Sequence, residues 1–301
     1  MDTTTKPAIV PRQDLDFGLD GDIPRYWFAG DPFKTRLFDA FSVLFPEGER
    51  FFINCVRDYR DRVTDPGQQQ QVKDFIRQEG QHGMVHDAFN RRLSAQGIRV
   101  ERIESTLHRL MEDERRYFPK RFTLACTAAA EHMTAVTTHG FSVNGQQFLD
   151  ADRRINAMYL WHGMEEIEHK AVAFDVLQQV AHGGYVLRVL AMLYISITFP
   201  LTVFAIMAHM FRVDGFSRRQ RLVLWARGLR WMYGRNGLYA GVAGHYWAWY
   251  RPGFHPWKHG AMRTYDIWLA AFQRHGDPLA AADAVRAEVT GEAPPVHALP
   301  A

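Results

Sequence analysis

Cysteine is almost absent from this sequence, which has two in 301 residues. Cys55 and Cys126 both fall within stretches of helical apolar spacing. We interpret them as small buried hydrophobic side chains rather than as a disulfide or as thiolate metal ligands. The chain also lacks any motif that resembles a flavin or iron–sulfur site, so redox chemistry would require an external electron donor. This cysteine usage fits the cytosol.

Neither sign of charge dominates, because the formal net charge is only +3. So small a positive charge does not indicate nucleic-acid binding, and no nucleic-acid-binding motif accompanies it. Residues 1–24 lack a positively charged start followed by an apolar run, so they do not predict a secretory signal. We therefore expect residues 1–32 to form a loose N-terminal arm laid over the domain of a cytoplasmic protein.

The most informative stretch is WHGMEEIEHK at positions 161–170, which holds two histidines and three glutamates. Residues three and four apart share one face of a helix, so His162, Glu166 and His169 should point the same way. Glu168 points away from that face and is expected to be solvated or paired. Isolated buried carboxylates are costly, whereas carboxylates that bind a metal are tolerated and usually functional.

Three further helical stretches offer partners for this motif. Glu79 and His82 form a second E-x-x-H, and Glu49 and Glu131 each lie on the apolar face of their own stretch. The order Glu, E-x-x-H, Glu, E-x-x-H is that of a dinuclear carboxylate site inside a four-helix bundle. The predicted metal ligands are Glu49, Glu79, His82, Glu131, His162, Glu166 and His169, with Glu79 and Glu166 placed to bridge.

Several polar residues near these ligands receive other roles. His86, one turn beyond His82, is a second-shell or core histidine, with a ligand role as the alternative. His132 and Glu165 are second-shell candidates. Glu47 follows Pro46, which we expect to interrupt or restart the helix, and a carboxylate at a helix N-terminus is favourable without any metal.

Small side chains flank Glu131 in the third bundle helix. Thr127, Ala128 and Thr134 would leave room for a substrate or for dioxygen beside the metal. The competing interpretation is close helix packing, and the sequence favours neither.

Four segments together resemble the bacterial family of predicted metal-dependent hydrolases. They are FPEGERFF at 45–52, QEGQH at 78–82, EEIEHK at 165–170 and RPGFHPW at 251–257. The resemblance runs from about Arg25 to about Leu269 and implies a metal-dependent activity. A narrower similarity, to arylamine N-oxygenases, rests on His162 ahead of the last E-x-x-H, because in that type such a histidine adds a further ligand.

The chain changes character after the last motif, because positions 189–208 hold no charged residue. That length could cross a bilayer, but a single crossing would place the metal bundle on the far side from the arginines that follow. We favour an element bent at Pro200 that lies on a membrane or caps the bundle, with a fully buried core helix as the equal alternative. The arginine- and tryptophan-rich stretch that follows suits an anionic lipid surface.

These observations predict an all-α protein. A ferritin-like four-helix bundle occupies residues 33–183. A helical apolar and Arg/Trp-rich extension, packed on the bundle or on a membrane, occupies residues 184–275. A short helix and a tail complete the chain at 276–301.

The predicted function is a dinuclear metalloenzyme that activates dioxygen to oxidise a small apolar or lipid-like substrate. Iron is the expected metal, with manganese or zinc as alternatives. One alternative is a hydrolase that directs a metal-bound hydroxide at an ester or amide, and another is a metal-storage protein. Expected partners are an external electron donor and the inner face of an anionic membrane, but not nucleic acid. The sequence leaves homodimer formation undecided.

Overall fold

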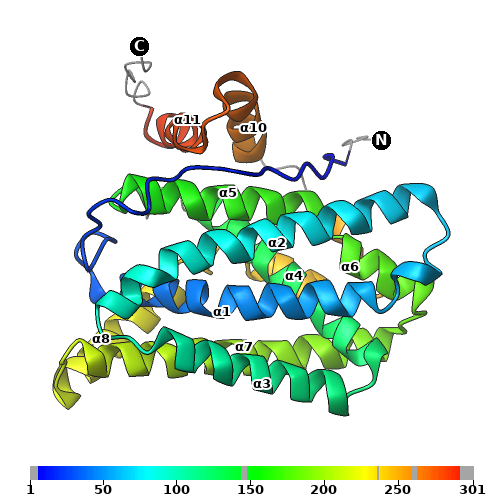
Figure 1. Cartoon of the computed structure of the whole chain (residues 1–301), viewed down its shortest axis with the longest axis horizontal. Coiled ribbons are helices and arrows are strands. Elements are labelled where there is room, and N and C mark those ends of the chain that lie inside the picture. Colours follow the sequence, from blue (N-terminus) through cyan, green and yellow to red (C-terminus); the bar gives the residue numbers. More distant parts are fainter. Residues whose placement is uncertain (1–5, 144–147, 236, 259–262, 292–301) are drawn as a thin grey trace.

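The computed structural model describes residues 6–143, 148–235, 237–258 and 263–291 (Figure 1). Within those ranges the regular secondary structure is helical, and a single isolated bridge pairs Phe28 with Ala151. The predicted all-α fold is therefore confirmed.

Four helices surround the predicted metal ligands. They are α1 (Pro32–Arg57), α2 (Pro66–Ala95), α4 (Lys120–Val143) and α5 (Arg153–His169). The crossover helix α3 (Val100–Tyr117) joins the first pair to the second and runs along one edge of the bundle (Figure 1). The side chains of Asp31 and Asp65 cap α1 and α2 by accepting backbone N–H groups, and each cap precedes a proline in the first turn.

The prediction that Pro46 interrupts the first helix is wrong, because α1 continues through it. An interior proline costs about 3 kcal/mol in a helix. Burial of α1 on both sides of Pro46, from Phe33 to Val56, outweighs that cost. Glu47 therefore lies mid-helix and bonds to Arg50 at 3.2 Å and His108 at 3.0 Å, outside the ligand cluster.

The helix of the last motif ends well before residue 183, where the predicted bundle range closes. α5 ends at His169, and a turn follows at Lys170 and Ala171. The chain then forms the short helix α6 (Val172–Asp175) and a π-helical turn over Val176–Val180. The break comes immediately after the last predicted ligand.

The extension begins with α7 (Tyr185–Val213), which is one helix through Pro200. By length and composition α7 could cross a membrane, a test that the core helix of a soluble protein can also pass. Its inner side, including Met192, Val203 and Met207, is buried. Its outer side is exposed, so the alternative of a fully buried core helix is wrong.

The remaining helices lie on two sides of the bundle. They are α8 (Arg218–Tyr233), α9 (Ala243–Ala248), α10 (Arg263–His275) and α11 (Pro278–Thr290). α8 lies near α7, whereas α10 and α11 lie at the opposite edge, next to the arm and α5 (Figure 1). Cys55 and Cys126 are buried free thiols.

The N-terminal arm is anchored rather than loose. Arg12 is only 6% exposed, and Phe17 packs on Trp161 of α5. Farther along the arm, the Trp27 indole N–H donates to Asp39 at 3.0 Å. The arm therefore belongs to the packed structure from Arg12 onward.

Candidate metal centre

The structure brings all seven predicted ligands together in the bundle interior. Two buried groups each have ligand atoms within 4.8 Å of one another: Glu49, His82 and His162, and Glu79, Glu166 and His169. Glu131 completes the second group, because its Oε2 lies 3.3 Å from His169 Nε2. The four bundle helices thus each contribute at least one carboxylate, as the order of the motifs predicts.

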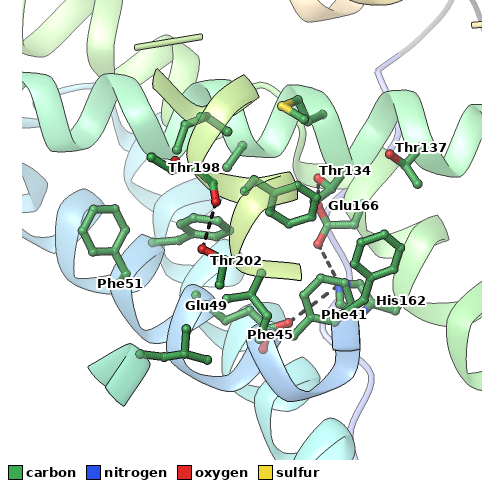
Figure 2. Close-up of a pocket in the computed structure, with 18 of the residues that line it drawn as sticks. Phe41, Phe45, Glu49, Phe51, Thr134, Thr137, His162, Glu166, Thr198 and Thr202 are labelled. Carbon is green, nitrogen blue, oxygen red and sulfur yellow. Dashed lines mark hydrogen bonds and ion pairs between the residues drawn. The ribbon is translucent and has the colours of Figure 1, made fainter. Parts of the chain in front are cut away.

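Glu166 lies at the centre of the cluster. Its Oε1 is 3.1 Å from His162 Nε2, 3.4 Å from His169 Nε2 and 3.6 Å from His82 Nδ1. Its other oxygen accepts the Thr134 hydroxyl at 2.6 Å (Figure 2). Glu166 therefore faces histidines of both groups, which is the placement that a bridging carboxylate needs.

A chain of hydrogen bonds fixes which nitrogen of His162 carries the proton. The Ser42 hydroxyl donates to Asn90 at 2.7 Å, so His86 Nδ1 must donate to Ser42 Oγ at 2.8 Å. A neutral His86 then accepts from His162 Nδ1 at 2.7 Å. His162 is left with an unprotonated Nε2 that faces Glu166, as a metal ligand requires. This places His86 behind the ligands.

The other two histidines are oriented in the same way. The Gln78 amide donates to Glu168 at 2.8 Å, so its oxygen accepts from His169 Nδ1 at 2.9 Å. His82 Nε2 donates to Glu165 Oε2 at 3.1 Å. Each histidine therefore turns toward the carboxylates the nitrogen that its own partner does not hold, the one that a metal ion would bind, and partners such as Glu165 typically fix the ring of a metal-bound histidine.

Carboxylates crowded around these nitrogens repel one another unless a metal ion or bound protons lie between them. The following buried atoms have no hydrogen-bond partner among the described residues: both carboxylate oxygens of Glu49, Glu79 and Glu131, His82 Nδ1 and His169 Nε2. Leaving so many polar atoms unpaired would be costly. The residues therefore fit metal ions, and mixed carboxylate and imidazole donors suit iron, manganese or zinc.

The titration behaviour of the site leads to the same conclusion. Burial, followed by neighbouring carboxylates, raises the pKa of Glu49 and Glu131 well above its usual range. Burial lowers the pKa of His82, which keeps this ring neutral. Burial alone would raise the pKa of Glu166, but His169 and His162 outweigh it and hold that pKa low. Without metal, the carboxylates cannot all be charged together.

Gly83 allows α1 and α2 to approach closely at the ligands. A Cβ atom built at this position would lie 3.2 Å from Glu49 Oε2. A side chain there would crowd the carboxylate that the first metal group requires. The glycine in the motif around His82 therefore has a steric role.

The arm supplies a cation behind the centre that the sequence analysis did not find. Arg12 donates to Glu165 at 2.9 Å and to Glu168 at 2.7 Å. Its guanidinium lies 5.0 Å from the ring centre of Trp268, and the Tyr265 hydroxyl also donates to Glu168, at 2.8 Å. Glu168 is thus paired, as predicted, but it is buried rather than solvated. Arg12 holds the two carboxylates that orient His82 directly and His169 through Gln78.

Replacing Arg12 with glutamine should weaken both the fold and the metal site. Glu165 and Glu168 would stay buried without their cation, and breaking a buried ion pair costs about 3–5 kcal/mol. Loss of an outer partner lowers metal affinity by roughly 10–100-fold. Thermal unfolding and metal titration would measure the two effects. Arg25→Gln is the control, because Arg25 is half exposed and its contact with Asp214 is 3.6 Å long. Equal melting temperatures for the two variants would contradict the role of Arg12.

Three predicted site residues lie elsewhere. His132 packs against the rings of Trp249 and Phe254, and its Nε2 is 3.1 Å from the His245 carbonyl oxygen, so it turns toward α9. Thr127 and Ala128 are buried and do not line the cavity that adjoins the ligands, and Thr127 donates to the Thr123 carbonyl. A residue next to Glu131 points about 100° away from it, which explains His132.

An apolar cavity of about 170 Å³ adjoins the metal centre. Glu49, His162 and Glu166 lie at its polar end, and Thr134, one of the three small residues that the sequence left open between pocket and packing, lines it (Figure 2). The rest of its wall is mainly apolar and includes Phe41, Phe45, Phe52, Met111, Ile195 and Phe199. A water-poor chamber therefore leads directly to the predicted ligands.

Fold and site together define an all-α protein with a buried carboxylate and histidine centre for metal ions. Residues 11–260 match the family described as "Predicted metal-dependent hydrolase", and the chain belongs to this family. This confirms the resemblance that the sequence motifs indicate. No curated protein and no solved structure matches the chain.

Proposed function

We propose that this protein is a dinuclear metal-dependent hydrolase that cleaves an ester or amide with a hydrophobic moiety. The family description supports hydrolysis. The observation that carries the proposal is the meeting of two buried ligand groups with one apolar cavity. Bound metal ions would polarise a carbonyl oxygen and lower the pKa of water.

The protein's own residues would bind and orient the substrate. Phe41, Phe45 and Phe199 line the cavity and would hold an acyl or aryl group while excluding bulk water. This would direct the polar end of the substrate toward Glu49 and Glu166. The Thr134 hydroxyl fixes one oxygen of Glu166 and leaves the other facing the histidines.

A second candidate function is dioxygen activation, which was the main prediction from the sequence. The specific observation in its favour is the ligand set, because four glutamates with two E-x-x-H pairs also suit a di-iron centre. The wall of the cavity would accept an unreactive hydrocarbon as readily as an ester. The family description favours the hydrolase.

One set of measurements separates these functions. We expect two metal ions per chain by mass spectrometry. We also expect the protein to hydrolyse p-nitrophenyl esters, with a kcat/KM that rises with the length of the acyl chain. Removing the metal ions with a chelator should abolish this hydrolysis. Iron that consumes dioxygen when a reductant is supplied, without esterase activity, would favour the second function. Full esterase activity after removal of both metals would overturn the proposal, and metal uptake without either activity would indicate storage.

Two glutamates on α1 provide a matched pair for this assay. Glu49 belongs to the first ligand group, whereas Glu47, two residues earlier, bonds to Arg50 and His108. We expect Glu49→Gln to lower kcat/KM at least about 100-fold, as loss of a metal-site contact does. Glu47→Gln should retain normal activity. Equal losses in the two variants would argue against the assignment of Glu49.

A further inference from the structure

Exposed large apolar side chains gather on one part of the molecule. Among the described residues, they lie on helices α3, α7, α8 and α9 or directly after α3. The two exceptions are Val10 and Met84. On α7 they form a stripe with helical spacing: Val186, Leu190, Leu193, Ile197 and Leu201, each 47–67% exposed. An exposed apolar stripe of this kind marks an interaction surface.

The same part of the chain is nearly free of carboxylates. Between positions 176 and 265, Asp214 is the one acidic residue in the sequence, and it is bound to buried Arg36 at 2.6 Å. Six exposed arginines form no ion pair with a carboxylate in the described part of the chain: Arg212, Arg218, Arg219, Arg227, Arg230 and Arg235. Surface arginines beside an apolar stripe are complementary to anionic lipid.

Helix α8, which carries most of these arginines, is packed on α7. Trp225 of α8 contacts Phe204 and Phe211 of α7 with ring centres 5.1 Å and 5.6 Å apart. α8 adds its own exposed Leu222 and Val223. The basic helix is therefore packed directly on the helix that carries the apolar stripe.

The opposite side of α7 explains why this helix would lie on a membrane rather than cross it. Val203, Met207, Met210 and Phe211 are buried against the bundle. Extracting α7 into a bilayer would leave the apolar bundle surface that they cover exposed to water, at about 1.5–3 kcal/mol for each large apolar side chain uncovered there. Pairing with a second copy through the same face would bring unpaired arginines together.

The cavity reaches this surface. Ile195, Thr198 and Phe199 of α7 line it, and so does Leu110 of α3, which is itself 54% exposed (Figure 2). The Tyr194 hydroxyl of α7 donates to Glu114 of α3 at 2.7 Å, which joins the two helices next to the cavity. An apolar molecule that leaves a bilayer here would pass between α3 and α7 toward the metal ligands.

We propose that α7 and α8 dock on the anionic surface of a lipid bilayer. The docking places the opening between α3 and α7 at the lipid, on the side opposite α10 and α11 (Figure 1). The docking proposal rests only on the exposed apolar and basic side chains of α7 and α8. The idea that docking admits a lipid-derived substrate rests on the proposed function.

Vesicle binding tests the docking without an activity assay. Metal-loaded protein should co-sediment with phosphatidylcholine vesicles that contain phosphatidylglycerol, much less with pure phosphatidylcholine, and less as salt rises. Ile197→Glu and Leu201→Glu should each weaken binding at least about tenfold, because a charge replaces a side chain that enters the lipid interface. Met84→Glu, an exposed apolar position on α2, is the matched control and should bind normally.

The arginines have their own matched control. Arg227→Gln/Arg230→Gln should weaken binding about tenfold or more, since each basic residue near an anionic surface contributes measurably. Arg57→Gln/Arg91→Gln removes the same charge from exposed positions on α1 and α2 and should change little. Circular dichroism and metal content verify folding of each variant.

Three results would overturn the docking proposal: no binding to anionic vesicles at low salt, equal binding by all variants, or a dimer in light scattering that Ile197→Glu dissociates. The last would make this face an interface between copies. Vesicle binding by a protein with no hydrolase activity would leave the docking intact and refute the proposed function alone.

Discussion

Replacing Glu166 with alanine should remove the metal centre while leaving the helical bundle folded. Glu166 Oε1 faces three histidine nitrogens from 3.1 to 3.6 Å, more than any other carboxylate oxygen of the cluster in the described structure. Its loss would take an oxygen from both ligand groups at once. We expect metal affinity to fall by more than about 100-fold, beyond the loss that an outer partner produces. Metal content after gel filtration would measure this.

Folding should survive because the substitution also removes a buried negative charge. Alanine is the best helix former, so α5 should keep its helicity. Circular dichroism should therefore match that of the parent protein, while the metal content falls toward zero. Full metal occupancy in Glu166→Ala would show that Glu166 is not a ligand. Glu47→Ala, on α1, is the control and should retain its metal.

The ligands could be predicted because their signal is local. Spacings of three and four residues on an apolar face assign Glu79 and His82 to one helix interior, and Glu166 and His169 to another. The same rule places Glu49 and Glu131. Packing four such faces against one core leaves little choice about where the carboxylates meet.

The outer partners could not be predicted because they are distant in sequence. Arg12 lies 153 residues from Glu165, and no periodic pattern relates an extended arm to a helix face. The sequence predicts only that Glu168 is solvated or paired and identifies no partner. Its burial, and therefore its need for a cation, is visible only in the structure.

The cavity residues show a different limit. Thr127 and Thr134 lie four residues before and three residues after Glu131, so helical spacing places both on the ligand face. The residues of α4 that line the cavity run from Ala130 to Thr138, so they do not reach back to Thr127. Helical spacing shows which face of α4 meets the ligands, but not toward which end of the helix the cavity extends. That direction depends here on where α3 and α7 lie. Pro46 shows a similar limit, because packing in the bundle keeps α1 helical through a residue that locally disfavours a helix.

Removing the metal ions should destabilise the protein, and the loss should grow as the pH rises above about 6.5. In the metal-free protein, burial raises the pKa of Glu49, Glu79 and Glu131. The folded state then holds protons that the unfolded chain has released, so stability falls with rising pH. His169 acts in the same direction, because Glu166 and Glu131 outweigh burial and raise its pKa.

The opposing groups act only at lower pH. Glu166, whose pKa is held low, affects stability below the ordinary carboxyl range. Burial lowers the pKa of His82 and His86, and these rings matter only below about pH 6.5, where the unfolded histidines charge. Lys170, with its pKa lowered to about 8 by burial, lies outside the ligand set, so its contribution should largely cancel when the two forms are compared.

Bound metal ions replace those protons, so the loaded protein should not show the same loss. Metal at 1,000 times its Kd contributes about 4 kcal/mol. For a chain of this size that corresponds to roughly 10 °C in Tm. The difference in Tm between loaded and chelated protein should therefore be about 10 °C near neutral pH and should widen toward pH 8.5. A difference that narrows with rising pH would mean that the buried carboxylates do not hold protons in the metal-free state. That result would remove the electrostatic argument for a metal centre.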